Sequence, residues 1–432
     1  MSIKICAPST EGKQRNVEVC ASSNVIKDWK DITINTEQNR IKKLQQRIAK
    51  AQQEGRYNKV KSLQYILTRS HCAKFCAVDK VTKNKGRKTP GVDGVKWSTS
   101  EDKLTAIKET KKWGYTPMPL KQVYVLKPNG TYRPISIPTM KDRTMQAIYK
   151  MALEPIAELV GDPHSYGFRV GRNTQSAIIR VKKVLSNLVS HNWLLKADIA
   201  DCFGNISHKW LMDNIQMDKA VLSKFLKSGY IESGTFFPTK QGTPQGGLIS
   251  PVLCNMTLDG LEKELKDKFR TVNFIRYADD FIVTGKSKKF LEQEVIPVIE
   301  SFLNKRGLHL SPEKTKITCV RDGFNFLGWN VRKVKKQVII IPSRKNLENF
   351  LFKIQNVSNA HFDDYTKIEL LKPKIRGWFN YHKDVVSQES LRMAEKKIRS
   401  CLGQLVSNKH LNVFLYSLFS AHSHMKKENV TG

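Results

Sequence analysis

Long apolar runs are missing from this sequence: no stretch reaches the roughly 18 consecutive apolar residues of a membrane-spanning helix. A secretory signal is also missing, because the first apolar stretch is short and lacks the required layout. The 8 cysteines are scattered, and only Cys72 and Cys76 lie close together, without a second pair to complete a zinc site. We therefore expect no membrane contact and a reducing compartment, either the bacterial cytoplasm and nucleoid or, alternatively, an organelle.

Acidic residues are scarce relative to basic ones. The chain has 39 Asp and Glu against 74 Lys and Arg, which gives a formal net charge of +35. Solubility requires a far smaller imbalance, whereas a surplus of this size on a folded protein is typical of proteins that bind a polyanion. Because 40% of the residues are apolar, the chain can build a folded core. A folded protein that binds nucleic acid is therefore favoured before any motif is considered.

The spacing of apolar residues predicts an α+β core followed by an all-helical C-terminal unit. Helical spacing extends over 36–70 with a break at Gly55, and a basic, glycine-rich loop follows at 82–97. A turn at Pro128–Gly130 between two short strands predicts a hairpin over 122–138. Further helices are expected at 139–160, after a cap at Thr174, at 248–269, at 287–306 and after 344. Further strands are expected at 193–198, 272–284, 324–332 and 337–342.

Two adjacent aspartates, Asp279 and Asp280, interrupt the apolar run Phe274–Thr284. Aspartate is disfavoured in strands, so the pair indicates a tight turn, which is either purely structural or functional. A second apolar strand, Trp193–Asp198, ends in another aspartate. If the two segments pair, three carboxylates meet at one strand end, and divalent cations would relieve their repulsion. Two Mg²⁺ ions held in this way are a standard device for phosphoryl transfer.

Eight segments together resemble the reverse transcriptases encoded by group II introns, which are also called maturases. They follow the family's order within residues 30–385, and chance does not explain this order. The segments are Thr89–Gly94, Arg133–Pro138, Ser165–Arg169, Asp198–Phe203, Gly242–Pro251, Tyr277–Asp280, Leu310–Lys314 and Phe326–Trp329. The resemblance implies an RNA-directed DNA polymerase that copies an RNA template, in the first place group II intron RNA, with dNTPs from a DNA primer or target. As the protein encoded by such an intron, it would act in splicing and retrohoming. It leaves the oligomeric state open.

The resemblance also implies a right-hand polymerase fold of fingers, palm and thumb. We expect a flexible leader at 1–30, a helical extension with an RNA-binding loop at 31–97, fingers at 98–192, palm at 193–342, thumb at 343–385 and a diverged maturase domain at 386–432. Motif matches fade after residue 385, and no Cys pairs or His-Asn-His layout indicate a DNA endonuclease domain. Priming would then come from elsewhere, such as a nascent strand at a replication fork.

The family's functional residues map onto this chain as follows. The resemblance assigns the two Mg²⁺ ions to Asp198, Asp279 and Asp280, and protonation of the leaving pyrophosphate to Lys314. It assigns the incoming dNTP to Lys127, Arg133, Phe203 and Gln245. It assigns nucleic-acid contacts to Arg169, Arg172, Gly246, Arg376 and Trp378. Cations suit phosphate oxygens, and a flat ring at Phe203 would exclude a 2′-hydroxyl and so select dNTPs over rNTPs.

Structural alternatives stay open for several of these residues. Phe203 and Trp378 are also suited to a core, Lys127 to an ordinary hairpin, and Lys314 to a solvated loop. Two other functions fit the same motifs: an RNA-binding splicing factor with an idle polymerase, and a domesticated reverse transcriptase in host repair or defence. The intact aspartates favour an active polymerase, whereas the weak C-terminal motifs argue against splicing more than against polymerisation.

Overall fold

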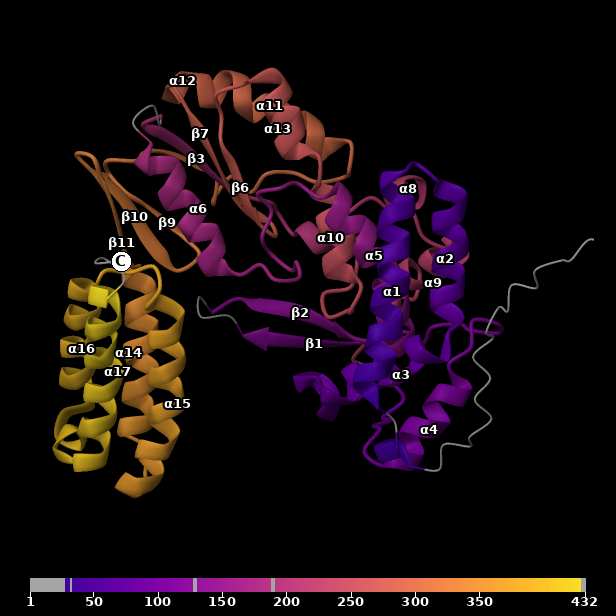
Figure 1. Cartoon of the computed structure of the whole chain (residues 1–432), viewed down its shortest axis with the longest axis horizontal. Helices are drawn as coiled ribbons and strands as arrows, with labels where there is room; N and C mark the ends of the chain where they lie inside the picture. Colours follow the sequence, from indigo (N-terminus) through magenta and orange to yellow (C-terminus); the bar gives the residue numbers. More distant parts are fainter. Residues whose placement is uncertain (1–27, 32, 127–129, 188–190, 429–432) are drawn as a thin grey trace, which may run out of the picture.

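The computed structural model describes residues 28–31, 33–126, 130–187 and 191–428, with side chains up to residue 419. Most of the predicted leader therefore lies outside the described residues. The same is true of Lys127, which was predicted to bind the dNTP. Three regions follow one another in space (Figure 1): helices of the N-terminal half, a central sheet with its covering helices, and a C-terminal helical bundle. The β1–β2 hairpin projects from the first region toward the third.

The N-terminal helices pack around one long helix, α5 (Met140–Val160). Gly55, at φ 68°, ends the first predicted helical stretch and separates α1 from α2. Apolar residues at helical spacing, such as Ile41 and Ile48, are buried against α5 in the core that also reaches the central sheet. The elements are η1 (Trp29–Asp31), α1 (Ile34–Gln53), α2 (Tyr57–Arg69), α3 (His71–Lys83), η2 (Lys85–Lys88) and α4 (Ser100–Glu109).

The predicted hairpin is present as β1 (Leu120–Leu126) and β2 (Tyr132–Ile137), which pair antiparallel. β1 also pairs in parallel with β4, so a four-stranded sheet forms in the order β2-β1-β4-β5. The strands β4 and β5 were not predicted, because each has only three residues. Their bounds are Tyr230–Glu232 and Thr235–Phe237.

The central sheet is antiparallel and has the strand order β6-β7-β3-β8. Its strands are β3 (Trp193–Asp198), β6 (Phe274–Tyr277), β7 (Asp280–Gly285) and β8 (Lys316–Cys319). Short helices cover it and connect it to α5. They are α6 (Thr174–Ser186), α7 (Cys202–Asn205), α8 (His208–Asn214), α9 (Lys219–Leu226), α10 (Ser250–Leu258), α11 (Leu261–Lys268), α12 (Lys288–Phe290), the π-helical turn η3 (Leu291–Val295) and α13 (Ile296–Asn304).

Two sequence predictions for these helices were wrong in detail. The helix expected over 248–269 is broken between α10 and α11, because Gly260 adopts the left-handed conformation at φ 95°. The cap of α6 is Asn173, whose side chain accepts a hydrogen bond from the Ser176 amide, and not Thr174, which is the first helical residue. Both errors come from turn chemistry that apolar spacing does not reveal.

The C-terminal helices form one bundle beside a small sheet of order β11-β10-β9. All four helices contribute to one core, and α14 packs on α16 as well as on α15. The predicted division at residue 385 therefore falls inside a single bundle. The elements are β9 (Phe324–Phe326), β10 (Trp329–Val334), β11 (Gln337–Pro342), α14 (Arg344–Ser358), α15 (Asp364–His382), α16 (Gln388–Leu402), η4 (Gly403–Ser407) and α17 (Lys409–Glu428).

The junction of small sheet and bundle contains a buried histidine, His382, between the rings of Trp329 and Trp378. Its Nε2 lies 3.1 Å from Asn346 Oδ1, and burial lowers its pKa to about 4. The unfolded chain binds this proton near pH 6.5, so the junction should lose about 3 kcal/mol as the pH falls from about 6.5 to about 4. As the pH is lowered, the NMR shifts of the His382 imidazole should show a neutral ring down to about pH 4. An imidazole that titrates near pH 6.5 would contradict this expectation.

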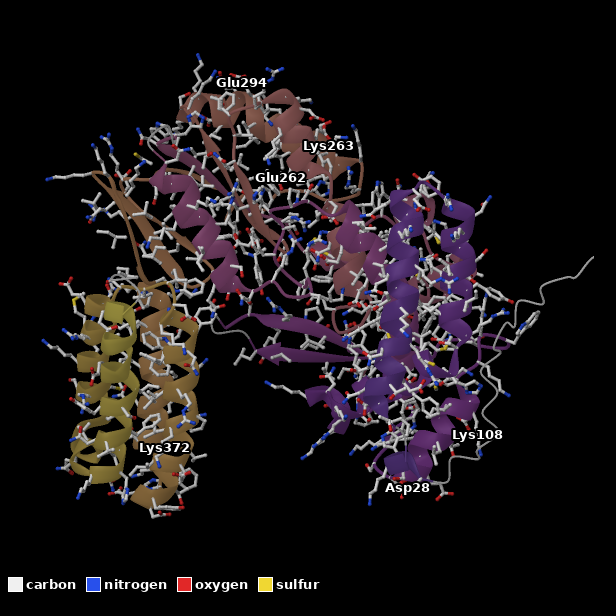
Figure 2. All side chains as sticks on the ribbon, in the orientation of Figure 1. Asp28, Lys108, Glu262, Lys263, Glu294 and Lys372 are labelled. Atoms are coloured by element: carbon white, nitrogen blue, oxygen red, sulfur yellow. The ribbon has the colours of Figure 1, made fainter. Side chains whose placement is uncertain are left out.

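Basic side chains project from every region of the chain, and Lys108 and Lys372 mark two distant regions in Figure 2. In the part of the chain that the structure describes, no helix combines the length and apolar character needed to cross a membrane.

Candidate active site

The register of the central sheet brings the three predicted carboxylates together. β3 pairs with β7 so that Asp198 lies opposite Asp280. β7 pairs with β6, and Ala278 and Asp279 form the tight turn between them. Asp198 and Asp279 are close enough for their charges to interact. The prediction that these aspartates converge at one strand end is therefore confirmed by the geometry.

The turn at Ala278 is strained, and a neighbouring loop fixes it. Ala278 has φ 57°, a conformation that L-residues adopt at a cost of about 1 kcal/mol or more. Gly167 packs so closely on the turn that a Cβ there would lie 2.4 Å from the Ala278 nitrogen. The segment Ser165–Arg169 is thus built against the β6–β7 hairpin, and its backbone also pairs with Arg276 of β6.

A buried arginine stands behind the hairpin. Arg276 is fully buried, and its guanidinium donates to Asp259 Oδ1 at 2.6 Å and to Asn255 Oδ1 at 3.1 Å, while Nη1 lies 3.4 Å from the Ala278 carbonyl oxygen. Asn255 in turn donates to the Gly167 carbonyl at 2.8 Å. Arg276 thus ties the strained turn, the Ser165–Arg169 segment and α10 into one hydrogen-bonded unit.

Arg169 belongs to the same buried network, which corrects the prediction that it contacts nucleic acid. Its side chain is 1% exposed and bonds to Asp259 Oδ1 at 2.5 Å and to the Ala157 carbonyl at 3.0 Å. A guanidinium that is fully paired inside the protein does not reach a phosphate. The motif match was correct in position, but its arginine supports the site from within.

Two lysines face the carboxylates. Lys314 Nζ donates to Asp198 Oδ1 at 2.8 Å, and Lys196 Nζ lies 3.2 Å from Asp280 Oδ1. Burial raises the pKa of Asp280 to about 6, which Lys196 opposes. Burial and the Asp198 charge raise the pKa of Asp279. The hydrogen bond to Asp198 raises the pKa of Lys314, so this ammonium group stays protonated.

In the described part of the chain, no three His, Cys, Asp or Glu side chains converge on one ion-sized centre. The carboxylates of Asp198 and Asp280 are instead directed to their lysines. Three carboxylates thus face two lysines at the end of β3.

The predicted dNTP residues approach this cluster from the β1–β2 sheet and the Gly242–Pro251 loop. Arg133 on β2 is exposed, and its charge acts on Asp279. Gln245 accepts a hydrogen bond from the Ser136 amide at 2.7 Å, and its side-chain amide lies 3.5 Å from Asp201 Oδ1. Gly246 has φ 125°, and a Cβ there would lie 2.5 Å from the Ser136 oxygen. The glycine is thus required by packing on β2, which accounts for it without a nucleic-acid contact.

Phe203 is half-buried beside the carboxylates, at the start of α7. Its ring packs edge-on against Phe168 at 6.3 Å. Phe168 is 52% exposed and has φ 60°, so it is held in a strained conformation at the surface. The structure thus adds an exposed ring, Phe168, beside the half-buried ring of Phe203.

The remaining predicted residues differ in exposure. Arg172 donates from Nη1 to the Ser165 and Pro163 carbonyl oxygens at 2.6 and 3.0 Å, so this nitrogen holds the loop. Arg376 is exposed on α15. Trp378 is 8% exposed, stacks on Phe350 and donates to Asn346 Oδ1 at 3.0 Å. The predicted nucleic-acid contact of Trp378 was therefore wrong, because this side chain is part of the bundle core.

Sequence reasoning missed three polar residues of the site: Lys196, Asp259 and Arg276. Lys196 offered a signal, because it precedes Asp198 by two positions and so lies on the same face of β3. Arg276 likewise stands in a strand of apolar neighbours, where an unpaired charge is costly. Asp259 lies between two helices that were predicted as one, and nothing local marked it.

Comparison with known protein families decides which family this chain belongs to. The reverse transcriptase (RNA-dependent DNA polymerase) family matches residues 125–331, and the N-terminal domain of reverse transcriptase matches residues 29–110. The group II intron maturase-specific domain matches residues 347–419. Protein YkfC of Escherichia coli is 32% identical over 293 residues, which cover 57% of this chain and 76% of that protein. The chain belongs to the group II intron reverse transcriptases.

A second relative agrees with this assignment. The group II intron-encoded protein LtrA of Lactococcus lactis is 28% identical over 410 residues, which cover 71% of this chain and 68% of that protein. Among solved structures, a Candida albicans telomerase aligns with a TM-score of 0.41 at 12% identity, over 82% of this chain and 66% of that one. From the family matches alone, the chain is an RNA-directed DNA polymerase with an α+β polymerase fold and a maturase-specific domain. The maturase match continues to residue 419, beyond the point where the motifs had faded.

Proposed function

We propose that this reverse transcriptase extends a DNA primer along group II intron RNA with dNTPs, using two Mg²⁺ ions held by Asp198, Asp279 and Asp280, and that it also assists splicing of the intron. The observation that carries the proposal is the pairing of Asp198 with Asp280 beside the strained Asp279 turn. Three hard oxygen donor groups, all partly buried, thus meet at the end of β3.

The donor set fits Mg²⁺. Carboxylate oxygens are its preferred protein ligands, and the raised pKa values of Asp279 and Asp280 show that their negative charge is stabilised poorly by the protein alone. When bound, Mg²⁺ activates the primer 3′-hydroxyl and stabilises the leaving pyrophosphate. Lys314 would release Asp198 and give its proton to the pyrophosphate. Arg133, which is exposed on β2, would bind the triphosphate.

Binding of Mn²⁺, a paramagnetic substitute for Mg²⁺, tests the metal assignment without measuring activity. The wild-type protein should bind Mn²⁺ when primer, template and dNTP are present, as shown by loss of the free-ion EPR signal. The triple variant Asp198→Asn, Asp279→Asn, Asp280→Asn should lose this binding. Equal Mn²⁺ binding by the wild type and the triple variant would refute the metal site.

Nucleotide choice provides a second prediction. Replacing Phe203 by Ala should lower the preference for dNTPs over rNTPs by about tenfold or more, since the ring no longer excludes the 2′-hydroxyl. Single-nucleotide addition with dCTP and with CTP measures this ratio. Phe168→Ala is the matched control, because it removes the neighbouring ring and leaves the proposed gate in place. An unchanged ratio in Phe203→Ala would show that this side chain has only a packing role.

The maturase-specific domain supports the splicing part of the proposal. Its exposed surface carries Arg376, and the whole chain carries a net charge of +35. Self-splicing of the host intron RNA at low Mg²⁺ should be faster with the protein than without it. Splicing help without any DNA synthesis would instead support an RNA-binding splicing factor with an idle polymerase.

A further inference from the structure

A pocket of about 590 Å³ lies between α2 and the segment that joins α8 to α9, with α5 as its floor. In Figure 1, α2, α8 and α9 lie on the opposite side of α5 and α10 from the catalytic strands β6 and β7. This volume is within the range of ligand-binding pockets. The pocket is separate from the carboxylate cluster, and the polymerase chemistry makes no use of it.

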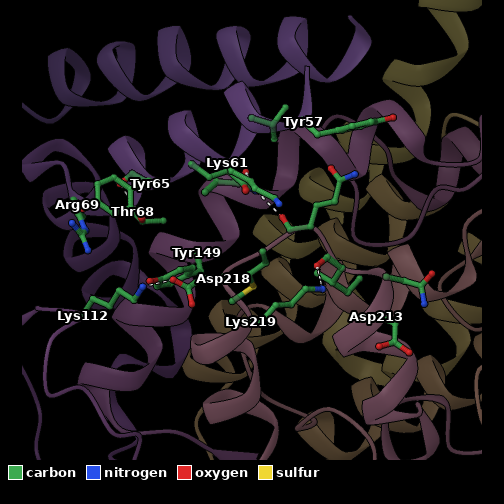
Figure 3. A pocket seen from close by; sticks show the side chains of 17 residues that line it. Tyr57, Lys61, Tyr65, Thr68, Arg69, Lys112, Tyr149, Asp213, Asp218 and Lys219 are labelled. Atoms are coloured by element: carbon green, nitrogen blue, oxygen red, sulfur yellow. Dashed lines mark hydrogen bonds and ion pairs between the residues drawn. The ribbon is translucent and has the colours of Figure 1, made fainter. Parts of the chain in front are cut away.

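One stripe of α2 lines the pocket with alternating rings and cations. Tyr57, Lys61, Tyr65 and Arg69 follow one another at four-residue spacing, which places them along one face of the helix. The rings of Tyr57 and Tyr65 are more than half exposed, at 55% and 54%. The Arg69 guanidinium lies over the Tyr65 ring, 3.6 Å from its centroid. Figure 3 shows Tyr57 and Tyr65 on either side of Lys61.

The opposite wall is partly apolar, and a hydrogen bond joins it to α2. Tyr149 of α5 is buried at the floor, near Lys112 and Asp218, which pair with each other. Gln64 Nε2 donates to the Gln216 carbonyl at 2.9 Å and so fixes α2 to the α8–α9 segment. These contacts fix the relative position of two pocket walls that are distant in sequence. The wall therefore presents a preformed slot and not a loose surface.

The charges around the pocket favour an anionic ligand. Four cationic residues line it, against two acidic ones, and Lys112 already neutralises Asp218. Lys61 and Arg69 remain exposed on the α2 stripe beside the exposed rings. Exposed aromatic rings alternating with cations are the combination that binds unstacked bases and their phosphates.

We infer that this pocket receives one unstacked nucleobase of a bound RNA against the exposed rings of Tyr57 and Tyr65, with Lys61 and Arg69 on the flanking phosphates. The inference rests on the proposed RNA-binding function and adds to it a specific subsite for a bulged or looped nucleotide, away from template and primer. RNA is favoured over a free nucleotide because Lys61 and Arg69 stand eight residues apart on α2, about 12 Å along the helix, so that they reach different phosphates of one chain.

The test compares two RNA hairpins of equal length, one fully paired and one with a single bulged nucleotide, in fluorescence anisotropy without dNTPs. The wild-type protein should bind the bulged hairpin about tenfold more tightly, the lower end of the effect of stacking one base on an aromatic ring. The double variant Tyr57→Ala, Tyr65→Ala should lose this preference, and Tyr57→Phe, Tyr65→Phe should keep it, because the rings remain.

Equal affinity of the wild type for both hairpins, or a preference that persists in the double Ala variant, would overturn the inference. The choice of RNA over a free nucleotide would be overturned if a free nucleoside monophosphate at micromolar concentration displaced the RNA while the protein showed no preference for the bulged hairpin. Primer extension on a short unstructured RNA template should be unchanged in the double Ala variant. Absence of primer extension by the wild-type protein would count against the proposed polymerase function. The preference for the bulged hairpin is measured without dNTPs and so does not depend on that function.

Discussion

Replacing Asp279 by Asn is expected to eliminate DNA synthesis and, at the same time, to raise the melting temperature by about 1–3 °C. Asn keeps the shape of the side chain and removes a buried negative charge that burial and Asp198 both disfavour. The site thus sacrifices stability for function, as polar active sites commonly do. Calorimetry and primer extension on the same protein sample measure the two effects.

The matched control is Asp213→Asn, which removes a carboxylate from the surface of α8. This change should alter neither the melting temperature nor the rate appreciably, since surface ion pairs contribute little. A lower melting temperature for Asp279→Asn would show that the carboxylate stabilises the fold, and the account of a self-repelling cluster would fail.

Replacing Arg276 by Gln is expected to lower the rate of nucleotide addition about 100-fold and to destabilise the protein by about 3–5 kcal/mol. The change leaves Asp259 with a buried charge that Arg169 alone must balance, and it frees the strained Ala278 turn. Because Arg276 contacts no carboxylate of the cluster in these hydrogen bonds, it acts as a positioning residue. Single-turnover rates at saturating dNTP and urea denaturation measure the two effects.

Arg276→Lys and Asn255→Ala separate positioning from stability. Lysine keeps a charge for Asp259 but lacks the fork that also reaches Asn255, so Arg276→Lys should recover stability more than rate. Asn255→Ala breaks the link to Gly167 without removing a charge, and it should also lower the rate at unchanged KM for dNTP. Variants that lose stability but retain full turnover would show that the network serves only the fold.

Much of the catalytic geometry could be predicted from the sequence because its signals are local. Asp198 ends a strand of apolar residues, and Asp279 and Asp280 interrupt another one, so strand periodicity alone placed them at strand ends. The hairpin over 122–138 was equally local, since its turn residues stand between two short strands.

What the sequence could not show depends on contacts between distant segments. Arg169 and Trp378 are residue types that often contact nucleic acids. Only their packing, against Asp259 and Phe350 respectively, shows that both side chains are buried. The single C-terminal bundle was missed for the same reason, because α14 packs on α16 across the predicted boundary at 385. Motif matching located these residues correctly but could not separate support of the site from contact with RNA.

Single-nucleotide addition to a DNA primer paired with an RNA template tests the central claim most directly. We predict that the wild type adds a dNTP in Mg²⁺ and that Asp198→Asn and Asp279→Asn add none, although all three proteins bind the primer–template with equal affinity. Extension by either Asn variant at the wild-type rate would contradict the assignment of catalysis to the paired ends of β3 and β7. Tight RNA binding with no addition by any of the three would identify an idle polymerase.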